Sequence, residues 1–228
     1  MRRPAIHSFG GLTLVTLHPS WARVIVPPFP MTALEFLAAY PAVSAVMDGA
    51  MFAPCAGEPN NYASYQCGRV EYAILDAVTR TFNPSSYPSR GATMLVYPDD
   101  EVRVMPGADP FAWGLPWLAW QGYPRLIEQG RNIASTTRDT NRTERAGLGR
   151  LRSGELVFVS GVDSMRGFAE SAVVIDIDEL VYSDGGESRV VAVRERDRIL
   201  ADQASNLTAR RVPSFVCAID PILWRNGL

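Results

Sequence analysis

Polar residues stand beside glycine at the ends of three predicted strands. These ends read Met47-Asp48-Gly49-Ala50, Trp120-Gln121-Gly122 and Ser183-Asp184-Gly185-Gly186-Glu187-Ser188. Glycine after a buried strand lets backbone N–H groups approach a ligand closely, and loops beside a sheet commonly carry functional side chains. Asp-Gly is also a common hairpin turn, so each turn taken alone has this structural explanation. Together they predict a site where carboxylates and backbone amides meet.

Arginines crowd the segment between the second and third turns. They are Arg138, Arg142, Arg145, Arg150 and Arg152, with Asp139 and Glu144 as the acidic residues among them. Three explanations stay open: a nucleic-acid-binding arm, an exposed segment with salt bridges, or one guanidinium that grips a phosphate or carboxylate in bidentate fashion. If residues 142–148 form a strand, alternate side chains face opposite sides. The cluster as a whole therefore cannot serve one pocket.

The residue inventory excludes several kinds of catalysis. All 22 basic residues are arginine, so Schiff-base chemistry and a P-loop lysine are excluded, and any fixed cation must be a guanidinium. The two histidines, His7 and His18, cannot form an HExxH zinc site. The GxSxG elbow of α/β-hydrolases is missing. We therefore expect no cofactor, and leave a divalent metal open.

The cysteines do not indicate a metal site either. Cys55, Cys67 and Cys217 have no CxxC spacing, which argues against a zinc knuckle. Cys55 and Cys67 could close one disulfide across a loop, or all three could be free thiols.

Length, charge and hydropathy describe a globular chain. Its 228 residues are 47% hydrophobic and carry a net charge of −2, which predicts one domain over residues 1–228 and argues against a general nucleic-acid binder. No apolar run is long enough for a membrane span, and residues 11–17 are too short for a secretory signal. We expect no membrane partner and a cytoplasmic or intracellular location, or a secreted or periplasmic one if a leader was removed. The oligomeric state stays open.

Many strands and few helices are predicted from short apolar runs bounded by Gly, Pro and Asn or Asp. Leu12–Leu17 and Arg23–Val26 suggest a hairpin around His18-Pro19-Ser20. Thr32 is the expected N-cap of a short helix over Ala33–Tyr40. The predicted fold class is α+β, with a large mixed, mostly antiparallel sheet and a few short helices.

The order of the turns resembles the phosphodiester glycosidase (uncovering-enzyme) family. Its members carry an Asn-Gly-Gly-Phe-Phe-like turn, a Gln-x-Gly-Pro-x-Leu-like segment, an Arg-Thr-Ala-x-Gly strand, a Leu-Asp-Gly-Gly-Gly-Ser turn and a closing Arg-x-Val-Pro-Asn segment. The corresponding segments here are Asp48–Phe52, Gln121–Leu126, Arg145–Gly149, Ser183–Ser188 and Arg211–Ser214. Three positions depart from the family pattern: Asp48 replaces its asparagine, Ala50 its second glycine and Glu187 the third glycine of its Asp-Gly-Gly-Gly turn.

The resemblance implies a hydrolase that cleaves the glycosidic bond of a small-molecule or glycan sugar-1-phosphodiester and releases sugar and phosphomonoester. Arg145, the motif arginine, is the expected phosphate clamp. Asp184 first and Asp48 second are the carboxylates expected to act as nucleophile or base. The expected substrate contacts are the other turn positions: Gly49, Gln121, Gly122, Gly185, Gly186, Glu187 and Ser188. Because of the three departures, a non-catalytic module that captures a phosphorylated sugar or nucleotide is the alternative.

Overall fold

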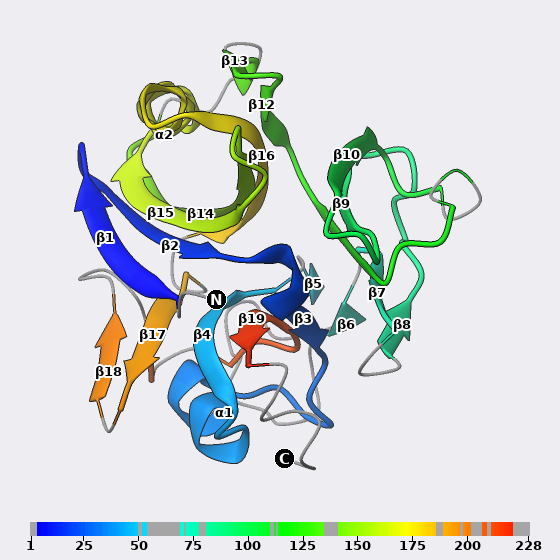
Figure 1. The fold of residues 1–228 in the computed structure, drawn as a ribbon, viewed down its shortest axis with the longest axis vertical. Coiled ribbons are helices and arrows are strands. Elements are labelled where there is room, and N and C mark those ends of the chain that lie inside the picture. Colours follow the sequence, from blue (N-terminus) through cyan, green and yellow to red (C-terminus); the bar gives the residue numbers. More distant parts are fainter. Residues whose placement is uncertain are drawn as a thin grey trace.

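The computed structural model describes residues 4–49, 52–53, 69–70, 72–77, 81–109, 112, 114–134, 141–185, 189–196, 198–201, 207–208 and 211–220. For residues 52, 53, 69, 81, 184 and 185 it describes the backbone alone. Strands dominate these ranges, and they gather into three larger sheets and one two-stranded ladder (Figure 1).

The largest sheet has seven strands and includes the predicted arginine strand. In spatial order it contains β1 (Ala5–Phe9), β2 (Leu12–Leu17), β15 (Leu156–Asp163), β14 (Thr143–Leu151), β16 (Ile177–Gly185), β12 (Arg125–Glu128) and β13 (Arg131–Asn132).

Two five-stranded sheets accompany it. The β4 sheet contains, in order, β18 (Arg198–Ala201), β17 (Val191–Glu195), β4 (Val43–Asp48), β19 (Phe215–Ile219) and β3 (Ala22–Ile25). The β9 sheet contains β10 (Val102–Pro106), β9 (Ala92–Val96), β11 (Leu118–Gly122), β7 (Ile74–Asp76) and β8 (Thr81–Asn83). The two-stranded ladder joins β5 (Phe52–Ala53) and β6 (Arg69–Val70).

The fold-class prediction is confirmed in its antiparallel character and corrected in its sheet arrangement. All pairings between the described strands are antiparallel, so the large sheet is not mixed. The strands are also divided among several sheets, and the described part is mostly β. The predicted hairpin around His18 is wrong, because the short 3₁₀ helix η1 (Pro19–Trp21) turns the chain out of the seven-stranded sheet and β3 joins the β4 sheet.

Two short α-helices cover outer faces of these sheets. Helix α1 (Ala33–Ala39) begins at the predicted N-cap: Glu35 N donates to Thr32 Oγ1 at 3.3 Å, and Thr32 N donates to Glu35 Oε2 at 2.9 Å. Such a capping box stabilises a helix by about 1 kcal/mol. Phe36 of α1 stacks on Phe215 of β19, with ring centroids 4.1 Å apart. Helix α2 (Met165–Val174) packs on the outer face of the seven-stranded sheet, against β12, β15 and β16 (Figure 1).

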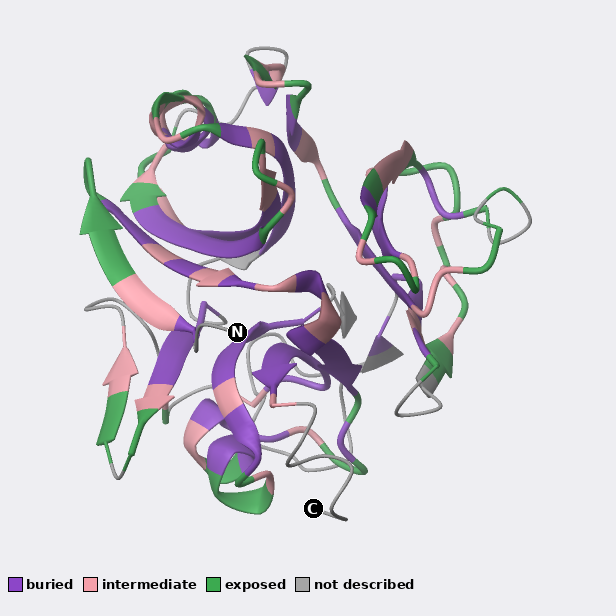
Figure 2. Ribbon diagram, in the orientation of Figure 1, coloured by how far each residue is buried: buried purple, intermediate pink, exposed green. Residues whose placement is uncertain are grey.

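The main core lies where the three larger sheets meet. The seven-stranded sheet contributes Leu148 and Phe158, the β4 sheet Met47, and the β9 sheet Met94 and Trp120. All five are completely buried, and buried strands run through the centre of Figure 2. No helix in the described part of the chain is both long and apolar enough to cross a membrane.

Candidate active site

Asp48 closes β4 at a place where two neighbouring strands approach it. Its backbone is paired with Phe215 of β19, and its amide donates to the carbonyl of Val190 at 3.3 Å. Its carboxylate accepts from Val190 N at 3.2 Å and from Ser183 Oγ at 2.7 Å. The residue is only 1% exposed. Its carboxylate is held by Ser183 of β16 and by Val190, which stands just before β17.

Gly49 follows Asp48 at a point where only glycine fits. A Cβ atom there would lie 2.3 Å from Ser214 Oγ and 2.6 Å from the Ser214 carbonyl. The Gly49 amide donates to that carbonyl at 2.9 Å, and its own carbonyl lies 2.6 Å from Ser183 Oγ. The predicted turn glycine therefore allows three chain segments to meet around the Asp48 carboxylate.

Arg145 lies on β14, directly opposite the end of β16. Its backbone pairs with Gly161 of β15 on one side and with Gly185 of β16 on the other. Its Nε donates to the Asp163 carbonyl at 3.2 Å and its Nη2 to the Asn141 carbonyl at 3.0 Å. These two carbonyls orient the guanidinium. Arg145 is almost fully buried, with its Cζ atom 5.9 Å from the centre of the Tyr182 ring.

A second buried guanidinium, that of Arg189, reaches the end of β15. Arg189 stands two residues before β17 of the β4 sheet. Its Nη1 donates to the Gly161 carbonyl at 2.9 Å, and the residue is 1% exposed. Burial lowers the pKa of Arg189, while the negative charges of Glu144 and Asp48 raise it again. The side chain is therefore close enough to Asp48 to feel its charge.

We call Asp48, Arg145, Ser183 and Arg189 the acid–arginine cluster. Two of its members are bound to the end of β15: Arg145 to Asp163, and Arg189 to Gly161. The position of Asp184 is set by its neighbours, because Ser183 bonds Asp48 and Gly185 lies opposite Arg145. The structure thus brings the backbone of position 184 near both Asp48 and Arg145.

Arg189 is a member of this cluster that sequence reasoning missed. It stands after the third glycine turn and before the apolar run Val190–Val193. A charged residue at the start of a fully buried strand is rare unless its charge is paired or used. An arginine directly before this apolar run was therefore the feature of the sequence that could have indicated Arg189 as a functional residue.

Gln121, a predicted substrate contact, lies outside the acid–arginine cluster. Its side-chain amide donates to the carbonyls of Tyr87 at 3.1 Å and Arg90 at 2.7 Å, and its oxygen accepts from Ala73 N at 2.9 Å. Both amide protons are therefore engaged in tying the β9 sheet to its loops. Trp120, which precedes Gln121, is completely buried in the main core.

Gly122 marks a close approach between two sheets. A Cβ atom on Gly122 would lie 2.2 Å from the carbonyl of Tyr182, three residues before Gly185. Of the other predicted contact residues, Gly186, Glu187 and Ser188 lie outside the described residues, as do Cys55 and Cys67.

Three other arginines of the predicted cluster lie close to acidic side chains. Arg150 pairs with Asp178, Arg152 lies 3.6 Å from Asp176, and Arg142 lies 3.7 Å from Asp163. Arg138 is outside the described residues. Among the described arginines of the group, Arg145 is buried, Arg142 and Arg152 are exposed, and Arg150 is half-buried in its ion pair, in keeping with alternation along a strand. Within the described ranges, no three His, Cys, Asp or Glu side chains gather as a metal site.

Comparison of the sequence with protein-family models and with curated proteins finds no match. Solved structures do share the fold. The catalytic domain of zebrafish N-acetylglucosamine-1-phosphodiester α-N-acetylglucosaminidase, auto-inhibited by its pro-peptide, superposes with a TM-score of 0.66 at 11% identity, over 95% of this chain and 81% of that one.

Two further structures show the same likeness. A hypothetical protein from Synechocystis has a TM-score of 0.59 at 15% identity, covering 94% of this chain and 61% of that one. A candidate exported protein from Burkholderia pseudomallei has a TM-score of 0.53 at 11% identity, covering 92% and 74%. The chain therefore has a distant fold relationship to a glycosidase catalytic domain. At these identities the relationship concerns the fold alone.

Proposed function

We propose that this protein is a hydrolase that cleaves the glycosidic bond of a sugar-1-phosphodiester and releases a sugar and a phosphomonoester. One observation carries the proposal: the buried guanidinium of Arg145 is held by backbone carbonyls at the end of β15, and Arg145 lies opposite the strand end that carries Asp184. The fold likeness to a glycosidase catalytic domain supports the same class of reaction.

The cluster suits a substrate whose leaving group is already a phosphate ester. Such a group departs without much help from a general acid. Fixed positive charge at the phosphate then contributes more to the rate, because preorganised donors stabilise charge that develops in the transition state. In this proposal Arg145 holds the phosphate, and its guanidinium is oriented in advance by the Asp163 carbonyl of β15.

The two aspartates receive different roles in this mechanism. Asp184 is the proposed nucleophile, or the base that activates water, at the anomeric carbon. Asp48 is completely buried and already accepts bonds from Ser183 and Val190. We therefore assign it a positioning role: it anchors Ser183, the residue before Asp184, and its charge faces Arg189.

The first test is release of phosphomonoester from a panel of sugar-1-phosphodiesters and nucleotide sugars, with and without EDTA. Asp184→Asn should lower kcat by about 10³-fold or more, and Arg145→Lys should lower kcat/KM by about 10²-fold, because an ammonium loses the bidentate geometry. Arg152→Lys, an exchange at an exposed arginine, is the matched control and should keep full activity. No release from any substrate by the wild type, together with retained phosphate-sugar binding, would instead identify a binding module.

Asp48→Asn tests the positioning role. Asparagine has the same shape, can accept from Val190 N and can donate to Ser183 Oγ, so the fold should persist. Removal of the charge that faces Arg189 should shift the pH profile of kcat and lower kcat by about tenfold, a smaller loss than at Asp184. A loss at Asp48 as large as that of Asp184→Asn, with binding intact, would make Asp48 the reacting carboxylate.

A further inference from the structure

Strand β1 forms one edge of the seven-stranded sheet. It pairs with β2 on one side, and no other strand in the described part of the chain pairs with its outer side. The unpaired N–H and C=O groups of an edge strand can bind a further strand. β1 lies at the rim of the molecule (Figure 1), and its last three residues are exposed (Figure 2). A partner strand can therefore reach this edge.

β1 lacks the features that usually protect an edge strand. Natural sheets protect their edges with charged residues, proline, short strands or a covering element. The sequence of β1, Ala-Ile-His-Ser-Phe, contains no Arg, Asp, Glu or Pro. The other described edges of the three larger sheets have such protection: β13 has two residues and includes Arg131, β10 includes Arg103 and Pro106, β18 begins with Arg198, β8 has three residues, and β3 is buried throughout.

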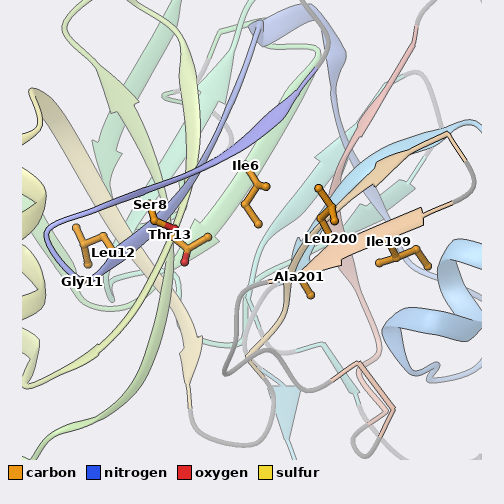
Figure 3. A pocket seen from close by; sticks show the side chains of 8 residues that line it. All are labelled: Ile6, Ser8, Gly11, Leu12, Thr13, Ile199, Leu200 and Ala201. Atoms are coloured by element: carbon orange, nitrogen blue, oxygen red, sulfur yellow. The ribbon is translucent and has the colours of Figure 1, made fainter.

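Strand β18, at the edge of the β4 sheet, does not close over β1. An opening with a volume of about 700 Å³ lies between the β1–β2 hairpin and β18. Figure 3 shows Ile6 and Ser8 of β1 on one side of this opening, and Ile199, Leu200 and Ala201 of β18 on the other. β18 is therefore not an element that protects the edge of β1.

The side chains of β1 are complementary to those of a second, antiparallel β1. In a register centred on His7, Ala5 lies opposite Phe9 of the second copy, and Ile6 lies opposite its Ser8. Side chains alternate between the two faces of a strand, so each of these pairs joins a large and a small side chain on one face. Like charges directly opposite each other would oppose pairing, but β1 contains no Arg, Asp or Glu.

We propose that β1 binds β1 of a second copy of this chain, antiparallel and about a two-fold axis at His7. The same patch then serves both copies, as a closed dimer requires, and the two seven-stranded sheets continue into one. Phe9, which is 55% exposed in the single chain, is covered in part by Ala5 of the second copy. A ladder of five residues buries less than the roughly 1,600 Å² of a standard interface, so we expect a weak, reversible dimer. The inference does not depend on the proposed reaction.

Sedimentation velocity over a series of protein concentrations tests the proposal. The wild type should change from monomer to dimer as its concentration rises. His7→Lys places two positive charges opposite each other at the axis and should raise the Kd of the dimer about tenfold or more. His7→Asp should do the same with two negative charges. His7 is exposed on an edge strand, where charge is well tolerated, so both variants should keep the circular dichroism spectrum of the wild type.

Phe82→Lys is the matched control. It places the same charge on β8, an edge strand of the β9 sheet, at a residue that is 62% exposed. The Kd of its dimer should equal that of the wild type.

Mixing the two His7 variants tests the register. An equimolar mixture of His7→Lys and His7→Asp should form a heterodimer about as tightly as the wild type dimerises, because Lys and Asp then face each other. A wild type that remains a monomer at about 1 mM would refute the proposal. If each variant alone dimerises as tightly as the wild type, the copies meet at another surface and the inference is wrong. It is also wrong if the wild type dimerises but the mixture stays monomeric, because the two His7 positions then do not meet.

Discussion

At the scale of single residues, six of the described charged residues are buried where charge is expensive. Asp48, Arg189 and Arg23 are each at most 6% exposed. Arg23 donates to the carbonyls of Ser20 and Ala22 and lies with its Cζ 4.6 Å from the Trp117 ring centre. Its pKa is lowered by burial, and the charges of Asp76 and Cys217 oppose that shift. Charges are retained in a core only where partners or a function offset the cost of desolvation; Arg23 and Arg189 both donate to backbone carbonyls, and Asp48 accepts from Ser183 and Val190.

Cys217 yields a prediction about pH. Burial raises the pKa of this thiol well above its ordinary value, the charge of Asp76 raises it further, and Arg23 opposes the shift. An unfolded thiol ionises near about pH 8.5, so between that pH and the folded-state pKa the unfolded chain binds fewer protons than the native protein. The free energy of unfolding should therefore fall by about 1.4 kcal/mol per pH unit in this window.

Cys217→Ala isolates this contribution, because the other titrating groups are common to both proteins. Urea unfolding of the two proteins between pH 7 and pH 10 should show a stability gap that is constant below about pH 8 and narrows above it. A gap that stays constant throughout this range would mean that the folded thiol ionises as readily as the unfolded one.

At the scale of elements, Asp76 joins two sheets that share no strand. It ends β7 of the β9 sheet, and its Oδ2 accepts from Val24 N of β3, in the β4 sheet, at 2.8 Å. The neighbouring residue Arg23 feels the charge of Asp76. One buried carboxylate thus satisfies an amide and balances a cation across the junction between β3 and β7.

Asp76→Ala should lower the free energy of unfolding by about 3–5 kcal/mol, because it leaves a buried guanidinium without its opposing charge. Glu170→Ala, which removes an exposed pair with Arg166 on α2, should cost no more than about 0.5 kcal/mol. Arg23→Met in the Asp76→Ala protein should recover part of the loss. Equal effects of the Asp76 and Glu170 changes in chemical denaturation would remove Asp76 from this role.

At the scale of the whole molecule, one core is shared by all three larger sheets. Phe158 belongs to the seven-stranded sheet, Met47 to the β4 sheet and Trp120 to the β9 sheet, and they form one buried cluster. A loss of packing there should be felt by every sheet, whereas the edge strands β1 and β18 carry exposed residues (Figure 2).

Phe158→Ala should destabilise the protein by about 3–5 kcal/mol through the cavity it creates. Because the core is shared, thermal melts followed by far-UV and near-UV circular dichroism should stay coincident and shift together to lower temperature. Phe9→Ala, at the 55% exposed end of β1, should leave the melting temperature nearly unchanged. Separate transitions for the two signals in the Phe158 variant would show that the sheets unfold independently.

The sequence by itself determined the local features of this protein. Alternation along residues 142–148 predicted that the arginine cluster could not serve one pocket, and Thr32 predicted the start of α1, because both patterns depend on residues only a few positions apart. The glycine turns predicted that Asp48 and position 184 would lie in one place, and their order carried the resemblance to a glycosidase fold.

Only the tertiary structure decided which sheet each strand joined and what each polar side chain met. The Ser183–Asp48 bond spans 135 positions, and the amide of Gln121 is used by loops 31 and 34 positions away. A strand's hydrogen-bonding edges accept any partner whose register buries the right face, so local sequence does not specify the neighbour. For the same reason, local sequence did not show that Arg189 would donate to the Gly161 carbonyl at the end of β15.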